Sequence, residues 1–75
     1  MATTTQTLAQ QFGARCRELR TAKTWSQELF ADNCEIHRSH MGEIERGEVD
    51  VTLTTLAKIA KGLQMTAGVI LKGIT

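Results

Sequence analysis

The stretch of sequence that decides the fold is IHRSHMGEIERG, residues 36–47. Met41 and Ile44 are three positions apart, so in a helix they share one face and can attach that helix to a core. Arg38 lies in the first turn, and the side roughly opposite the apolar pair carries Ser39, Gly42, Glu43 and Arg46. Thin residues beside two arginines suit a helix that lies close against a large anionic surface. The pattern therefore points to DNA.

Helix starts recur along the rest of the chain. In each, an apolar residue precedes a residue that can cap a helix, and a second apolar residue follows four places after the cap, which is the hydrophobic-staple arrangement. The pattern occurs at Trp25-Ser26…Phe30, Ile36-His37…Met41, Val51-Thr52…Leu56 and Met65-Thr66…Ile70. It predicts four helix starts, of which the one at His37 is unusual because imidazole is not a favoured cap.

A fifth helix is expected ahead of these, from Thr7 to about Ala22. Thr7 and Gln10 fit a capping box, and an apolar stripe recurs at helical spacing at Leu8, Phe12, Cys16 and Leu19. The sequence therefore predicts an all-α fold, a compact five-helix domain over residues 7–75. Residues 1–6 are polar and threonine-rich, and we expect them to form a flexible N-terminal arm.

The ends and faces of these helices follow from the same patterns. Gly47 is a plausible stop for the third helix, and Gly62 lies near the end of the fourth. Trp25, as a staple residue, is expected to lie mostly in the core. The buried stripe of the fourth helix is predicted to be Leu53, Leu56, Ile59, Ala60 and Leu63.

The second and third predicted helices form the key pair. The helix that starts at Ser26 runs to about Cys34, and the next begins near Arg38 after a very short turn. Two helices joined so briefly cannot lie antiparallel side by side, so they must cross steeply. This is the geometry of a helix-turn-helix, in which the second helix enters the major groove.

Composition limits the other possibilities. The chain has 75 residues and no proline, which fits one small domain. Its net charge of +1 is weak evidence for a nucleic-acid partner. Cys16 and Cys34 fall on apolar faces of predicted helices and no secretory leader is visible, so we expect free, buried thiols in a cytoplasmic protein. No apolar run approaches the ~20 residues of a membrane span.

Catalytic and metal sites are not predicted. Cys34, His37 and His40 are spaced by three, but no second cluster supplies the four ligands that structural zinc requires. We expect no metal and no cofactor. The sequence also lacks a nucleophile–base pair, paired carboxylates and a phosphate-cradling glycine loop, so an enzyme is not expected.

Three segments together resemble the lambda-repressor-type (XRE/Cro) helix-turn-helix family. They are SQELFA at residues 26–31, IHRSHMGEIERG at residues 36–47, and the apolar pattern from Leu53 to Leu63. The resemblance extends from about Leu8 to Gly73. A separate domain of this size is similar to the controller proteins of restriction–modification systems, and small phage repressors and antitoxins share the layout.

The resemblance implies roles for individual residues. Gln27, first in the second helix, would contact a phosphate, helped by the helix N-terminus. Arg38 and Ser39 would meet base edges or nearby phosphates, and Glu43 would face the groove. Arg20 and Glu45 match positions that form a buried ion pair between the first and third helices, and Ala31 is small where the second and third helices cross.

For other residues the sequence leaves two roles open or departs from the family pattern. His40 either packs beside the groove or reaches a phosphate, and Arg46 either contacts a phosphate or balances the helix dipole. Glu35 stands where the family usually has glycine, so we expect a strained residue or a different turn. Glu48 and Asp50 make the following loop acidic where the family's loop is often basic. Glu43 can accept from cytosine but repels phosphates.

The function predicted from the sequence is a sequence-specific transcriptional regulator that binds a palindromic double-stranded DNA operator as a homodimer, with RNA polymerase as a further candidate partner. The C-terminal segment is more apolar than one short helix can bury, which is typical of a partner interface. The interface candidates are Met65, Val69, Ile70, Leu71 and Ile74. The alternative function is a protein-interaction module on the same scaffold, an antitoxin or adaptor, which the low charge and acidic loop favour.

Overall fold

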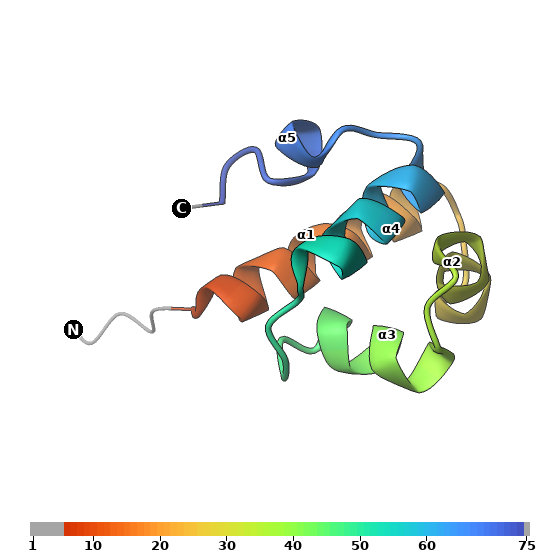
Figure 1. The fold of residues 1–75 in the computed structure, drawn as a ribbon, viewed down its shortest axis with the longest axis horizontal. Coiled ribbons are helices and arrows are strands. Elements are labelled where there is room, and N and C mark those ends of the chain that lie inside the picture. The colour runs from red at the N-terminus through yellow and green to blue at the C-terminus, as the bar shows by residue number, and fades with distance from the viewer. Residues whose placement is uncertain (1–5, 75) are drawn as a thin grey trace.

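The computed structural model describes residues 6–74, and in it most helices begin at a residue whose side-chain oxygen caps them. Four helices have a hydroxyl cap: α1 (Leu8–Ala22), α2 (Gln27–Cys34), α4 (Leu53–Leu63) and α5 (Ala67–Ile70). The hydroxyls of Thr7, Ser26, Thr52 and Thr66 each accept from the backbone N–H three residues later. The helix α3 (Arg38–Glu45) starts after His37 without a side-chain cap. The five predicted helices are thus confirmed within the described residues (Figure 1).

The helices pack around one apolar core. Helix α3 packs against α1 and α2, α4 against α2, and α5 against α4. Figure 1 shows α5 on the opposite side of α1 and α4 from α3. The buried side chains of the core are Phe12, Cys16, Leu19, Phe30, Ala31, Cys34, Ile36, Met41, Ile44, Ile59, Leu63 and Ile70. Burial of Met41 and Ile44 fixes which side of α3 remains available to a partner.

Two glycines allow α1 and α3 to approach closely. A Cβ on Gly13 would lie 2.3 Å from the carbonyl oxygen of Ile44, so only a residue without a side chain fits there. Gly47 ends the third helix region with φ +73°, and a Cβ on it would lie 2.6 Å from the Cα of Gln10. The expected stop at Gly47 is therefore a left-handed position pressed against α1.

Two expected core positions are wrong. Leu53 is 84% exposed and Leu8 is 59% exposed, because each is the first residue of its helix and projects past the core. Gly62 lies near the end of α4, as expected, one residue before Leu63. A Cβ on it would be 2.4 Å from the Sγ of Cys34, and the left-handed Gln64 is the C-cap. Trp25 is largely buried and packs against the core, as expected, with its ring centroid 6.3 Å from that of Phe30.

The turn between α2 and α3 is left-handed at Glu35, with φ 57° and ψ 40°. Its N–H donates to the carbonyl of Asp32, and the N–H of Ile36 donates to that of Ala31. These bonds close α2 and turn the chain directly into α3. Glu35 is thus the strained residue that we expected at the position where the family usually has glycine.

Residues 1–5, most of the predicted N-terminal arm, lie outside the described residues. Cys16 and Cys34 are buried and unpaired thiols. No helix of the described part of the chain is long and apolar enough to cross a membrane. Between Gln6 and Ile74, no cluster of three potential metal-ligating side chains is present.

Candidate nucleic-acid interface

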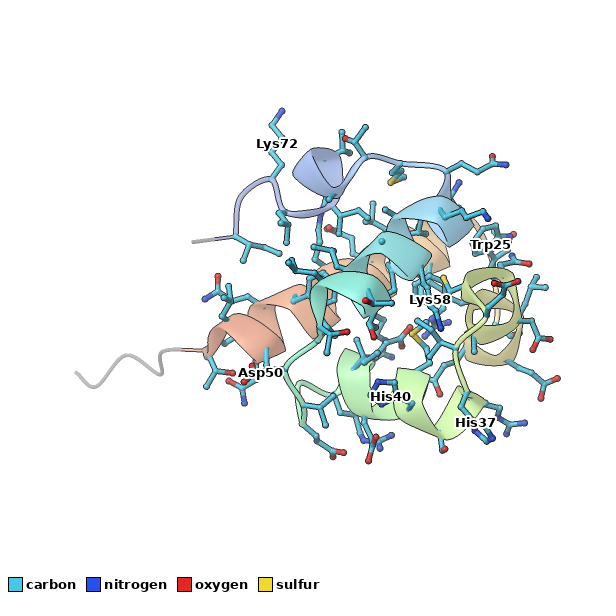
Figure 2. All side chains as sticks on the ribbon, in the orientation of Figure 1. Trp25, His37, His40, Asp50, Lys58 and Lys72 are labelled. Carbon is cyan, nitrogen blue, oxygen red and sulfur yellow. The ribbon has the colours of Figure 1, made fainter. Side chains whose placement is uncertain are left out.

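The outer side of α3 is available to a large partner. Met41 and Ile44 point into the core, whereas Arg38 and Ser39 are exposed at the start of the helix. Figure 2 shows His37 and His40 along the same helix. The helix therefore divides into a buried side and an accessible side, as its sequence predicted.

A shallow hollow of about 440 Å³ lies where α2 meets α3. It is lined by Gln27, His37, Arg38, Ser39, Gly42 and Arg46. Gly42 lets the hollow form, because a Cβ there would lie 2.9 Å from Nη1 of Arg46 and 3.4 Å from Oε1 of Gln27. The structure thus brings together two predicted phosphate-contacting residues, Gln27 and Arg46, and two predicted base-reading residues, Arg38 and Ser39.

His40 and Glu43 are absent from the lining of this hollow. His40 Nδ1 lies 3.2 Å from Glu43 Oε1, and both side chains are about half exposed. They form a second pair one turn further along α3. Ser39 Oγ lies 3.2 Å from His37 Nδ1, so the first turn of α3 carries its own polar contact.

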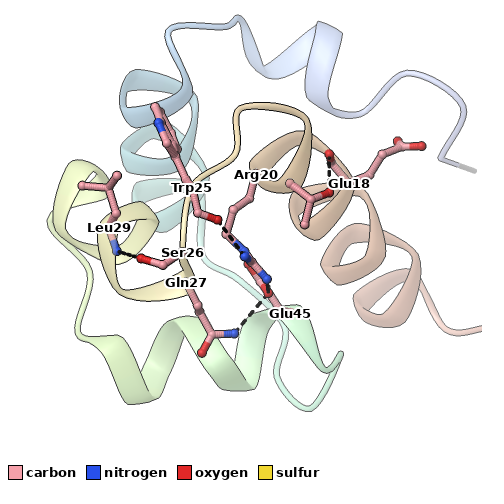
Figure 3. A network of polar contacts seen from close by, with 8 residues as sticks. Glu18, Arg20, Trp25, Ser26, Gln27, Leu29 and Glu45 are labelled. Carbon is pink, nitrogen blue, oxygen red and sulfur yellow. Dashed lines mark hydrogen bonds and ion pairs between the residues drawn. The ribbon is translucent and has the colours of Figure 1, made fainter.

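A shielded ion pair between Arg20 and Glu45 contacts Gln27, one of the residues that line the hollow (Figure 3). Arg20 donates from Nε to Glu45 Oε2 over 2.7 Å and from Nη2 to Oε1 over 3.0 Å. Its Nη1 donates to the carbonyl of Trp25, so one guanidinium joins α1, α3 and the segment before α2. The side chains of Arg20 and Glu45 are 13% and 4% exposed, so the pair is largely shielded from water.

Gln27 belongs to this network as well as to the hollow. Its Nε2 donates to Glu45 Oε1 over 3.1 Å, a contact that the sequence did not predict. The carboxylate of Glu45 therefore fixes the side chain of Gln27 at the edge of the accessible surface. A phosphate contact would use the N–H of Gln27 that Glu45 leaves free.

Each cationic candidate on this surface has a carboxylate partner. Arg38 donates from Nη1 to Glu28 of α2, and Arg46 donates from Nε and Nη2 to Glu48. The hydrogen bond from Arg46 lowers the pKa of Glu48, and the same contact raises the pKa of Arg46. Sequence reasoning missed Glu28, because ten positions separate it from Arg38 and only the crossing of α2 and α3 brings them together.

One predicted interface residue is corrected by the structure. Ile70 is fully buried, because α5 turns it into the core, so it is not available to a partner. Val69 and Leu71 remain 47% and 38% exposed, and Met65 and Ile74 are partly buried against the core. Leu71 also lines an apolar hollow of about 420 Å³ whose other walls are Leu8, Ala9, Phe12, Val49, Asp50, Val51 and Leu56.

Two helices crossing at a short turn, with an accessible second helix held by a buried ion pair, define a helix-turn-helix protein of the DNA-binding transcriptional regulator class. The Helix-turn-helix family HTH_3 matches residues 17–70. The chain belongs to this family.

Curated relatives carry the same kind of domain. The chain is 42% identical to control protein C.BamHI of Bacillus amyloliquefaciens over 53 residues, which cover 69% of this chain and 65% of that protein. It is 37% identical over 62 residues to the SPbeta prophage-derived uncharacterized HTH-type transcriptional regulator YonR of Bacillus subtilis, covering 83% of this chain and 57% of that protein. The chain thus spans less than two thirds of the length of both relatives.

The fold matches a solved structure of similar size. The restriction–modification controller protein C.AhdI of Aeromonas hydrophila superposes with a TM-score of 0.79 at 40% sequence identity. The match covers 83% of this chain and 94% of that chain. The similarity therefore extends over nearly all of the controller protein.

Proposed function

We propose that this protein is a sequence-specific regulator that binds a palindromic operator as a homodimer and controls a restriction–modification system. The observation that carries the proposal is the hollow at the junction of α2 and α3, where Gln27, Arg38, Ser39 and Arg46 surround Gly42. The likeness to control proteins supports the biological role.

In the proposed complex, α3 of each subunit lies in the major groove. Arg38 and Ser39 read base edges from the first turn, and Glu43 accepts from cytosine N4. Gln27, His40 and Arg46 contact phosphates that fix the position of the helix. A two-fold dimer would set its half-sites about 34 Å apart, one turn of the duplex. A contact between the operator-bound dimer and RNA polymerase stays a prediction.

Selection of bound sites from a random duplex library at two salt concentrations tests this function. We expect an enriched palindrome whose half-sites are one turn apart and which is retained at the higher salt. Arg38→Ala should weaken operator binding by roughly 1–3 kcal/mol and relax the preference at one base pair. Gln27→Ala should weaken binding without changing the preferred operator. The absence of any enriched sequence would contradict the proposal.

A second function has one observation in its favour. The accessible surface carries Glu28, Glu43 and Glu48 beside its cations, an arrangement that also suits a protein partner. An antitoxin or adaptor role on the same scaffold would then replace operator binding. DNA binding that disappears uniformly with salt, with no sequence preference, would favour this second function.

A further inference from the structure

The carboxylate of Glu28 holds Arg38 in a specific way. Glu28 lies in the first turn of α2, and its Oε2 accepts only from Nη1 of Arg38. Both side chains are mostly exposed, at 63% and 67%, and among the described residues Glu28 is the one that accepts a hydrogen bond from the Arg38 guanidinium. The pair therefore stands at the rim of the hollow with donors of Arg38 still free.

The contact with Glu28 leaves one donor edge of the Arg38 guanidinium available to a base. A guanidinium has five N–H donors in a rigid fork, and a bidentate contact to guanine O6 and N7 uses one edge of it. Glu28 occupies Nη1, which leaves the edge formed by Nε and Nη2 for a base. Arg38 can thus contact a guanine without leaving Glu28. A phosphate on the same edge would lie beside the Glu28 carboxylate, which repels another anion but not a neutral base.

Arg46 provides a contrast on the same surface. Glu48 accepts from both Nε and Nη2 of Arg46, at 2.9 and 3.2 Å. It therefore occupies the edge of Arg46 that corresponds to the free edge of Arg38. Arg46 must thus release its carboxylate before the edge formed by Nε and Nη2 can contact DNA. The two pairs have the same charges but present their arginines differently.

We propose that Glu28 is a specificity-determining residue, which holds Arg38 toward a base edge and opposes its use on the phosphates of random sequence. This role rests on the proposed operator-binding function. It makes Glu28, which lies outside the recognition helix α3, part of the recognition of the operator sequence. Glu48, by contrast, lowers binding to every duplex alike.

The test compares affinity for the selected operator with affinity for a random duplex of the same length at one salt concentration. In Glu28→Gln we expect the ratio of these affinities to fall roughly fivefold, the factor that an exposed ion pair can supply. Glu48→Gln should raise both affinities and keep the ratio. Glu18→Gln controls for net charge, because Glu18 pairs with Arg15 on α1 away from the hollow.

Two further variants separate this role from a structural one. Glu28→Asp keeps the charge beside the N-terminus of α2, but its shorter side chain moves the carboxylate away from Arg38. It should therefore lower the ratio of operator affinity to random-duplex affinity as Glu28→Gln does. In an Arg38→Ala background, Glu28→Gln should leave the ratio unchanged, because the residue acts through Arg38. Thermal unfolding should show all variants folded.

The outcomes distinguish this inference from the proposed function. If the library yields no operator, the proposed function and this inference fall together. If an operator is found but Glu28→Gln moves the ratio no more than Glu48→Gln does, only the role of Glu28 is overturned. An effect of Glu28→Gln that persists without Arg38 would overturn it as well.

Discussion

Glu45 accepts three hydrogen bonds from two side chains, and this residue connects the stability of the fold to its accessible surface. Arg20 donates two of them and Gln27 the third. Glu45→Gln keeps the shape of the side chain but leaves the shielded guanidinium of Arg20 without a counter-charge. We expect a loss of roughly 3 kcal/mol in the free energy of unfolding, measured by urea denaturation.

The exposed pair on α1 offers a matched control for that measurement. Glu18 is 68% exposed where it meets Arg15, so Glu18→Gln should cost less than about 1 kcal/mol. Equal losses in the two variants would show that the Arg20–Glu45 pair is no more than a surface ion pair.

The buried thiol of Cys16 predicts an alkaline limit to stability. Burial raises the pKa of Cys16 from 9.0 to about 12, with the nearby Glu45 adding to the effect. Between pH 9 and pH 12 the thiol is ionised in the unfolded chain but still protonated in the folded one. The free energy of unfolding is therefore unaffected by this group below pH 9 and falls as the pH rises toward 12. The loss should be about 1.4 kcal/mol per pH unit for this group.

Urea unfolding between pH 8 and 11 measures this slope. Cys16→Ala lowers stability at every pH by leaving a small cavity, but its stability should decline less steeply above pH 9 than that of the natural chain. Parallel declines would contradict a buried, neutral thiol at this position.

At the scale of elements, the sequence predicted where helices begin better than which side of each helix is buried. The hydroxyl caps at Thr7, Ser26, Thr52 and Thr66 act within one turn, so local sequence contains the whole interaction. The exposure of Leu53 depends on how far α4 extends past its neighbours, which periodicity does not encode. The same limit applies to the candidate site: its α3 residues follow from spacing, but the partner of Arg38 follows only from the crossing of α2 and α3.

The turn between α2 and α3 carries a conformational cost that a substitution should remove. Glu35 is left-handed, a conformation that costs a side-chain-bearing residue roughly 1–2 kcal/mol relative to glycine. Glu35→Gly should raise the free energy of unfolding by about 0.5–1 kcal/mol, because part of the relief is lost to the greater freedom of glycine in the unfolded chain.

A glycine placed elsewhere in the same helix is the control for this prediction. Asp32 is exposed and helical in α2, so Asp32→Gly should destabilise by roughly 0.5–1 kcal/mol. If Glu35→Gly also destabilises, the left-handed turn is not a source of strain, and its glutamate makes a favourable contribution of its own.

At the scale of the whole molecule, exposed apolar side chains form the surface on which we propose that a second copy of the chain packs. Leu53, Val69 and Leu71 are 84%, 47% and 38% exposed, and Leu71 borders the apolar hollow that Leu8 and Leu56 also line. A small domain gains stability by covering such surface, and a two-fold interface uses each residue twice.

Leu71→Glu tests whether this surface forms the proposed dimer. Burial of a leucine contributes about 1.5–3 kcal/mol, so its replacement by a charge should raise the dimer dissociation constant at least roughly tenfold in sedimentation experiments. Leu29→Glu is the matched control, because Leu29 is 43% exposed on α2 and should leave self-association unchanged. If dimerisation positions the two α3 helices, Leu71→Glu should lose affinity for the full palindrome while a single half-site is bound as before. An unchanged dissociation constant in Leu71→Glu would place the interface elsewhere on the molecule.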